Sequence, residues 1–244
     1  MITPAKSSIK SWQLRGRVPA TVLLIIIVWI YGGLILFHLS QNRPYRLNDI
    51  FFYTLIIASP MVLVLLLLLR FITGERFNDL NLKPARWWLD VLGGIGLPVL
   101  TLGTAFFLGP MFEQILPGAP HEGLDRSSFA GLAGDPMRLA LFLGPGMMLG
   151  VAGFEELLRV LLLSRWWKIA SGITWHWLGI LVAALLTGLA HLYQGPGGVM
   201  TTAFIGVIWC IAYLRFGRVW PLIISHYIHD ALQIVLFVFL IQSG

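Results

Sequence analysis

The chain has 244 residues, of which 57% are hydrophobic and only 11% are charged, and its mean hydropathy is +0.82. A soluble domain is about 25% charged, so this composition excludes an ordinary soluble protein and indicates an integral membrane protein. The net charge of +6 does not indicate nucleic-acid binding, because the basic residues lie mainly in short connections between apolar segments. The single cysteine, Cys210, allows no disulfide within the chain.

The N-terminal region, residues 1–19, is basic and carries Lys6, Lys10, Arg15 and Arg17. The apolar segment that follows it, residues 20–39, is longer than the hydrophobic region of a secretory signal peptide, which has about 7–15 residues. No small-residue cleavage site follows this segment. We therefore interpret residues 1–19 as a cytoplasmic tail and residues 20–39 as a retained first membrane span.

Crossing a bilayer as a helix takes about 20 apolar residues, and the sequence contains seven segments of this kind. They are residues 20–39, 50–72, 87–109, 137–163, 178–195, 199–216 and 219–241. Gly144-Pro145-Gly146 should kink or break the long fourth segment, which would add a short extra helix. The sequence thus predicts an all-α transmembrane helical bundle of seven to eight spans.

Charges in the connections predict the orientation of this bundle. The N-terminal tail is basic, as are the connections at residues 73–86, at Arg165 with Lys168, and at Arg215 with Arg218, whereas residues 110–136 are acidic. By the positive-inside rule, the N-terminus lies in the cytoplasm and the C-terminus outside. We therefore predict an integral protein of the cell (plasma) membrane.

The tryptophan-rich residues 166–177 are interpreted as an interfacial segment at the cytoplasmic surface rather than as part of a span. This interpretation starts the fifth span near Leu178 and places His191 about 20 Å into the membrane, at 1.5 Å per residue. A span that began at Gly172 would move His191 to the far side of the membrane and separate it from the other polar groups.

The fourth segment contains three ionisable residues, Glu155, Glu156 and Arg159. Ionisable groups at bilayer depth are costly and indicate a functional site by default. On a helix, Arg159 lies three and four residues from the two carboxylates and can approach both. The alternative is a structural ion pair between helices. One arginine neutralises one glutamate, however, and the remaining buried carboxylate is suited to act as a general base near neutral pH.

Two later segments carry further polar residues: His191 in the fifth, and His226, His229 and Asp230 in the seventh. Asp230 lies one helical turn after His226, and an acidic partner orients an imidazole and selects its tautomer. Gly188 and Ala190 allow a neighbouring helix to pack closely beside His191. Each histidine taken alone is also compatible with a polar contact between helices. No role is assigned to His38, His121 or His176.

A glutamate pair and two histidines on three successive segments resemble the CPBP family of membrane proteins, the CAAX protease and bacteriocin-processing group, also called Abi. The family pattern is EExxxR, then FxxxH, then HxxxN or HxxxD. The corresponding residues are Glu155 and Glu156 with Arg159, then His191, then His226 with Asp230. The resemblance covers about residues 137–241, which we take as the catalytic core. Residues 20–136 hold generic spans and loops.

The sequence departs from this family pattern at two positions. Two residues separate the glutamate pair from Arg159 instead of three, and Thr187 stands where the family usually has Phe. The shorter spacing leaves two registers: either Glu155 is the base and Val160 takes the usual arginine position, or Glu156 serves as the base. We favour Glu155, because the carboxylate carries the chemistry and the arginine supports it. Thr187 is expected to affect packing more than chemistry.

The resemblance implies an intramembrane endopeptidase that acts on a membrane-associated peptide or protein and is surrounded by membrane lipid. Glu155 would activate water for attack on a peptide carbonyl, with Glu156 and Arg159 in support. His191 and His226 would orient water and move protons. Asp230 would either help to stabilise the oxyanion, for which it must be protonated, or orient His226.

Three alternatives stay open at this point. Two histidines and a glutamate with water also form a catalytic zinc set, but the HExxH motif is absent, as are the serine-type GxSG and aspartyl-type GxGD motifs. We therefore expect no metal or other cofactor, with zinc as the second choice. The same residues fit a proton relay in a transporter, although no paired repeat is present. A catalytically silent scaffold or immunity protein on the same fold is the third.

Overall fold

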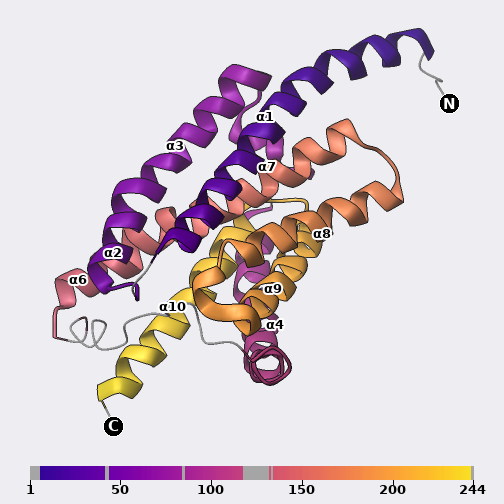
Figure 1. The fold of residues 1–244 in the computed structure, drawn as a ribbon. Helices are drawn as coiled ribbons and strands as arrows, with labels where there is room; N and C mark the ends of the chain where they lie inside the picture. Colours follow the sequence, from indigo (N-terminus) through magenta and orange to yellow (C-terminus); the bar gives the residue numbers. More distant parts are fainter. Residues whose placement is uncertain (1–5, 42–43, 84–85, 118–131, 133, 243–244) are drawn as a thin grey trace.

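The computed structural model describes residues 6–41, 44–83, 86–117, 132 and 134–242, and its regular elements are helical (Figure 1). The prediction of an all-α membrane bundle is confirmed. The first half of the chain forms α1 (Lys6–Ser40), a continuous rod of α2 (Leu47–Phe51), η1 (Phe52–Ala58), α3 (Ser59–Leu68) and η2 (Leu69–Thr73), the short η3 (Phe77–Leu80), and α4 (Trp87–Ile115).

The second half begins with another continuous rod. Its parts are α6 (Pro136–Leu141), η4 (Phe142–Gly153) and α7 (Phe154–Ile169), and the remaining elements are α8 (Ile173–Leu189), η5 (Leu192–Gln194), α9 (Gly195–Phe216) and α10 (Trp220–Gln242). Helices therefore lie at all seven predicted apolar segments. The basic residues 6–19 are helical and continue into the rest of α1 without a break.

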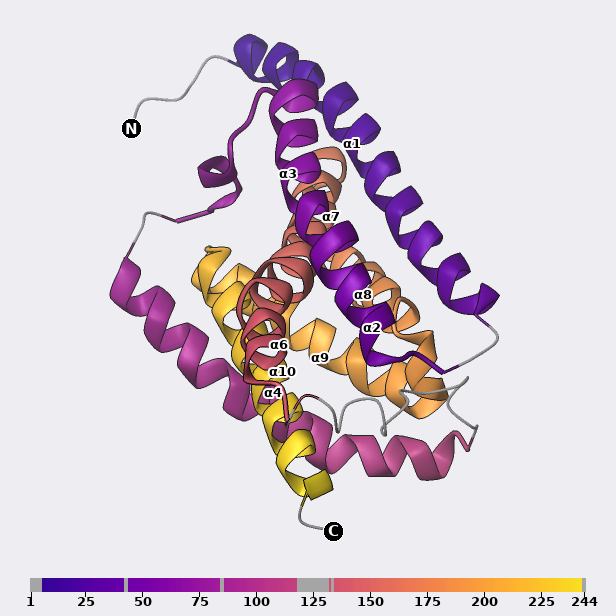
Figure 2. The same cartoon turned by 90° about the vertical axis from the view of Figure 1, so that its left-hand side faces the viewer.

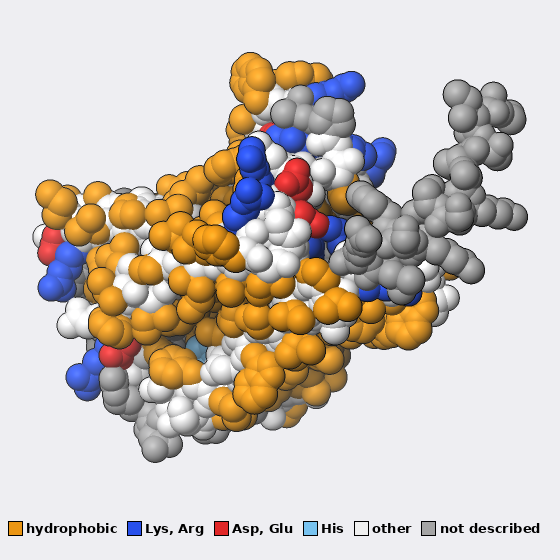
Figure 3. All heavy atoms as spheres, turned by 90° about the horizontal axis from the view of Figure 1, so that it is seen from above, with side chains coloured by type: hydrophobic (Ala, Val, Ile, Leu, Met, Phe, Trp, Pro, Cys, Tyr) orange, Lys and Arg blue, Asp and Glu red, His pale blue; other side chains and the backbone are white. Residues whose placement is uncertain are grey.

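Four helical stretches are long and apolar enough to cross a membrane: Gly16–Ser40, Leu47–Thr73, Trp87–Ile115 and Leu192–Phe216. They correspond to the first, second, third and sixth predicted spans. Crossing by the other three segments stays a prediction. Hydrophobic side chains cover most of the face drawn in Figure 3, where charged side chains gather in a few groups. Such a surface suits contact with lipid, which cannot hydrogen-bond polar groups.

Helix α7 lies at the centre of the bundle. It packs against α1, α3, α8, α9, α10 and η4, and every residue from Glu156 to Arg165 is buried. Figures 1 and 2 both place α7 between α1 and α3 on one side and α4 and α10 on the other. Glu156, Arg159 and Arg165 consequently face other helices instead of lipid.

The kink predicted in the fourth segment is present. Gly144 has non-helical torsion angles, φ −78° and ψ −106°, and the following turns of η4 are widened to π-helix geometry. Beyond the kink, η4 packs against η1. A Cβ atom at Gly150 would lie 2.1 Å from the Thr54 carbonyl oxygen, so this close approach requires glycine. It fixes η1 beside the start of α7, where the candidate site lies.

Residues 166–177 are more helical than predicted, and their interfacial location stays a prediction. These residues form the end of α7, a turn at Gly172 with φ +107°, and the start of α8, so that α8 begins at Ile173 and not near Leu178. His191 is nevertheless not separated from the other polar groups, because α7 and α8 pack side by side as a hairpin (Figure 1). His191 follows the end of α8, and its ring turns back toward the Thr187 carbonyl oxygen. A depth counted along the helix axis misses this turn.

A polar clasp ties the connection after η2 to the far end of α7. Arg165 Nη2 donates to Glu75 Oε2 at 2.7 Å, and Lys168 Nζ pairs with the other carboxylate oxygen. Partial burial alone would raise the pKa of Glu75, but the hydrogen bonds and positive charges of Arg165 and Lys168 outweigh it and hold that pKa below its usual value.

We expect Glu75→Gln to lower the melting temperature at pH 7, because it leaves the buried Arg165 guanidinium without its carboxylate. A carboxyl group with a lowered folded-state pKa stabilises the fold above its unfolded pKa, and this contribution is lost as pH falls through the folded pKa. The difference between the variant and the unaltered chain should therefore shrink in acid, as measured by thermal unfolding in detergent.

The matched control for this measurement is Glu113→Gln, which makes the same change at an exposed glutamate of α4. It should leave the melting temperature nearly unchanged at every pH. Equal losses in the two variants would contradict the assigned role of the clasp.

Candidate active site

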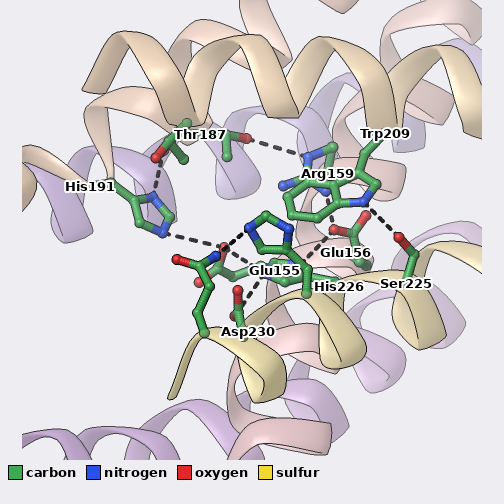
Figure 4. A network of polar contacts seen from close by, with 12 residues as sticks. Glu155, Glu156, Arg159, Thr187, His191, Trp209, Ser225, His226 and Asp230 are labelled. Carbon is green, nitrogen blue, oxygen red and sulfur yellow. Dashed lines mark hydrogen bonds and ion pairs between the residues drawn. The ribbon is translucent and has the colours of Figure 1, made fainter. Parts of the chain in front are cut away.

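The motif residues of α7, α8 and α10 meet at one cavity of about 630 Å³. Glu155, His191, His226 and Asp230 line this cavity, together with Arg159, whereas Glu156 lies behind them and is fully buried. Figure 4 shows these side chains pointing toward one another from three helical segments. The structure thus brings together all six residues that the sequence singled out.

Glu155 presents its carboxylate to two imidazole rings. Its Oε2 atom lies 3.8 Å from His191 Nε2 and 3.9 Å from His226 Nε2, and its side chain is 24% exposed. It is therefore partly accessible from the cavity while both rings stay close to it. This arrangement suits a carboxylate that exchanges a proton with a bound water.

Glu156 is held in a buried charged network. Its Oε1 atom accepts a hydrogen bond from His226 Nδ1 at 2.7 Å and forms an ion pair with Arg159 Nη1. These three side chains are at most 4% exposed. Buried charges are tolerated only when they are paired, so Glu156 is committed to Arg159 and His226. The two adjacent glutamates consequently occupy different environments.

The hydrogen-bond partners of the histidines fix where their protons lie. His191 Nδ1 is 2.9 Å from the Thr187 carbonyl oxygen, which can only accept, so Nδ1 carries a proton, and Nε2 offers a lone pair when the ring is neutral. His226 has a carboxylate at each nitrogen, because Asp230 Oδ2 lies 3.2 Å from its Nε2. With both carboxylates ionised, each nitrogen must donate, and His226 is an imidazolium.

The family comparison agrees with these positions. Residues 137–232 match the family model described as "Type II CAAX prenyl endopeptidase Rce1-like". This segment is similar to Rce1-like domains. The match confirms the resemblance to the CAAX protease family, and it contains every residue of the three motifs. Neither a search of curated proteins nor a search of solved structures gave a match.

Within the Rce1-like segment, Thr187 does more than the packing role expected of it. Its Oγ1 donates to the Ala183 carbonyl oxygen at 2.8 Å and accepts from Arg159 Nε at 3.4 Å, while its own carbonyl oxygen holds His191. Thr187 therefore links the buried arginine to the imidazole near Glu155. A phenylalanine at this position would supply the same carbonyl but not the hydroxyl.

Trp209 forms an aromatic platform beneath the charged network. Its ring stacks on the His226 ring with centroids 4.2 Å apart, and the Arg159 guanidinium carbon lies 4.8 Å from the indole centroid. Its Nε1 atom donates to Ser225 Oγ at 3.3 Å. Sequence reasoning missed this residue, because a tryptophan in an apolar segment carries no signal that it faces a charged group.

Residues before the Rce1-like segment also line the cavity. Tyr31 and His38 of α1 and Tyr53 of η1 are among them. Helix α1 and the rod from α2 to η2 therefore contribute to the site and are not generic at this point. His38 Nδ1 lies 2.7 Å from the Tyr45 hydroxyl. His176 instead packs on Trp167, and His121 lies outside the described residues.

His229 contributes to the site by joining α10 to α4. Its Nδ1 atom lies 2.9 Å from Thr101 Oγ1, and its Nε2 atom lies 2.6 Å from Gln233 Nε2. Both ring nitrogens are thus engaged, and the ring also meets Trp209 edge-on at 5.7 Å. His229 therefore holds α10 in the rotation that directs His226 and Asp230 toward Glu155.

We expect Trp209→Leu to destabilise the fold by about 2–3 kcal/mol, because it removes a stacked ring from His226 and a cation–π contact from Arg159. Trp209→Phe keeps an aromatic face and loses the hydrogen bond to Ser225, which should cost about 1 kcal/mol. Chemical denaturation of the two variants in the same detergent measures the difference, and equal losses would contradict the platform role.

Proposed function

We propose that this chain is an intramembrane endopeptidase that hydrolyses a peptide bond of a membrane-associated peptide or protein with water activated by Glu155. One observation carries the proposal: the Glu155 carboxylate lies at a cavity with two imidazole Nε2 atoms 3.8 and 3.9 Å away. The Rce1-like segment supports a protease of the CAAX type at the level of the family.

In the proposed reaction, Glu155 takes a proton from water while the water oxygen bonds to the carbonyl carbon, and the carbonyl electron pair moves to its oxygen. Collapse of this intermediate breaks the carbon–nitrogen bond, and Glu155 returns the proton to the departing nitrogen. The Nε2 lone pair of His191 accepts a hydrogen bond from the water and orients it.

Of the two roles considered for Asp230, its position supports orientation of His226. Asp230 Oδ2 lies 3.2 Å from His226 Nε2, so it accepts from the imidazolium. A carboxylate that accepts there cannot also donate a hydrogen bond to an oxyanion from that atom. Glu156 and Asp230 thus hold the His226 ring from its two nitrogens.

The register in which Glu155 is the base also fits the geometry better than the alternative. Glu156 is enclosed by Arg159 and His226 and has no exposed surface, so a water could reach it only after the ion pair breaks. Arg159, shifted by one residue from the family spacing, reaches Glu156 from three residues away on the same helix.

The proposal also includes the orientation of the chain, with the N-terminus in the cytoplasm of a cell that holds it in its plasma membrane. Three basic connections meet at one end of the bundle, where Lys168 pairs with Glu75 and Arg218 with Asp90, and Lys83 Nζ donates to the Arg215 carbonyl oxygen. Basic connections gathered on one side support a cytoplasmic location of that end.

We expect Glu155→Gln to abolish cleavage, whereas Glu156→Gln and Arg159→Lys leave weakened but measurable activity, because these two residues only support the site. The assay uses protein reconstituted in vesicles and a fluorescence-quenched peptide that ends in a prenylated CAAX sequence, beside the same peptide without the prenyl group. Folding of each variant is checked by thermal unfolding.

Near-normal cleavage by Glu155→Gln beside an inactive but folded Glu156→Gln would show that Glu156 is the base. Proton-coupled flux without cleavage would favour a transporter. A biological effect that survives Glu155→Gln unchanged, without cleavage, would favour a silent scaffold or immunity protein.

The proposed reaction proceeds without a metal. Among the described residues, no group of three His, Cys, Asp or Glu side chains is arranged to hold a metal ion. The Nε2 atom of His226 donates to Asp230 and thus has no lone pair to offer.

We therefore expect cleavage to survive strong chelators, and the purified protein to lack stoichiometric zinc. Peptide cleavage with and without EDTA or phenanthroline, together with elemental analysis, checks both statements. Loss of activity with a chelator, followed by recovery with added zinc, would reverse this part of the proposal.

A further inference from the structure

We propose that the hydroxyl group of Tyr193 donates the hydrogen bond that stabilises the oxyanion formed during peptide-bond hydrolysis, which makes Tyr193 a further catalytic residue. This inference rests on the proposed function. It deepens that function by assigning a step for which the motif residues leave no suitable group.

Apart from Arg159, whose Nη2 atom has no partner but almost no exposed surface, the motif residues near Glu155 have no uncommitted proton to offer an oxyanion. Asp230 accepts from His226, and the two N–H groups of the His226 imidazolium point to Asp230 and Glu156. His191 carries a proton on Nδ1, and this N–H group already donates a hydrogen bond to the Thr187 carbonyl oxygen. The negative charge of a tetrahedral intermediate nevertheless needs a donor, since such stabilisation is usually the largest single contribution to catalysis.

Tyr193 stands beside these groups and lines the same cavity. It lies two residues after His191, in η5, and the two rings pack with centroids 5.7 Å apart. The rings of His38 and Tyr45 contact it at 5.2 and 5.7 Å. The rings of His191, His38 and Tyr45 therefore hold the Tyr193 ring in place, as a preorganised donor requires.

A chain of hydrogen bonds sets the direction of the Tyr193 hydroxyl proton. Thr202 Oγ1 donates to Gln194 Oε1 at 2.9 Å, so the Gln194 amide turns its oxygen toward Thr202 and its nitrogen toward Tyr193. Gln194 Nε2 then donates to the Tyr193 oxygen at 3.2 Å. Because the phenol oxygen accepts this bond, its own proton is available for donation, and successive hydrogen bonds of this kind strengthen one another.

Tyr53 and Gln233 are among the other cavity residues that carry a donor group. Gln233 Nε2 already faces His229 Nε2 at 2.6 Å. No hydrogen bond to the Tyr53 hydroxyl occurs within the described part of the chain, so nothing there fixes its direction. Tyr193 is the better donor, because its hydroxyl is oriented before the substrate arrives.

The proposed step leaves atoms and charges balanced. As the water oxygen bonds to the carbonyl carbon and Glu155 takes the water proton, the carbonyl oxygen becomes an oxyanion that accepts a hydrogen bond from the Tyr193 hydroxyl. The tyrosine keeps its proton throughout. When the carbon–nitrogen bond breaks, the electron pair returns to the carbonyl and Glu155 protonates the leaving nitrogen.

The test is Tyr193→Phe, which removes only the hydroxyl and keeps the ring that packs against His191, His38 and Tyr45. With the reconstituted protein and the quenched prenylated CAAX peptide, we expect kcat to fall about 10²–10³-fold, the usual effect of losing one oxyanion donor. KM and the melting temperature should stay unchanged, whereas a merely structural role would change the melting temperature.

Tyr227→Phe is the matched control, because Tyr227 neighbours His226 in sequence, packs in the hydrophobic core and does not line the cavity. It should retain the kcat of the unaltered chain. A folded Tyr193→Phe with unchanged kcat would overturn the inference, as would Tyr53→Phe or Gln233→Leu showing the loss in its place.

The same assay separates failure of this inference from failure of the proposed function. Cleavage that Glu155→Gln abolishes and Tyr193→Phe leaves unchanged retains the protease and overturns only the role of Tyr193. No cleavage of either peptide by the unaltered chain, with the protein folded and inserted, overturns both.

Discussion

The rest of the site depends on one buried interaction, the sharing of the Glu156 carboxylate between Arg159 and His226. It joins the central helix α7 to α10 in a region where none of the three side chains reaches solvent or lipid. Removing one partner of such a network leaves an unpaired buried charge, which is strongly unfavourable. The network therefore fixes the distance and rotation of the two helices that carry the proposed base and the second imidazole.

Adjacent positions on a helix differ by about 100°, and this rotation gives the glutamate pair its two environments. Glu156 turns inward to the ion pair, and Glu155 turns toward the cavity. Arg159 lies three residues from the inner carboxylate and also reaches Thr187 on α8. The spacing that is one residue shorter than in the family is thus accommodated because Arg159 pairs with Glu156. The Glu155 carboxylate, which faces the cavity, stays free of the guanidinium.

The cavity wall comes from parts of the chain that lie far apart in sequence. Close backbone approach at Gly150 sets η1 against η4, and α1 lies against α7. Aromatic residues of α1 and η1 therefore complete a site whose charged residues lie in the second half of the chain. Polar atoms that face this cavity are oriented in pairs: Thr187 for His191, Asp230 for His226, and Gln194 for Tyr193.

The sequence by itself determined the all-α membrane class, the approximate positions of the seven helices and the kink at Gly144, and its motifs predicted the convergence of Glu155, His191 and His226. Apolar length, glycine and proline positions, and charges within apolar segments are local properties, and they required no knowledge of neighbouring helices. Only the tertiary structure decided that α8 starts at Ile173 without displacing His191, and that Thr187, Trp209 and Tyr193 serve the site. Their side chains are ordinary in an apolar helix, and their roles arise from the groups that packing brings beside them.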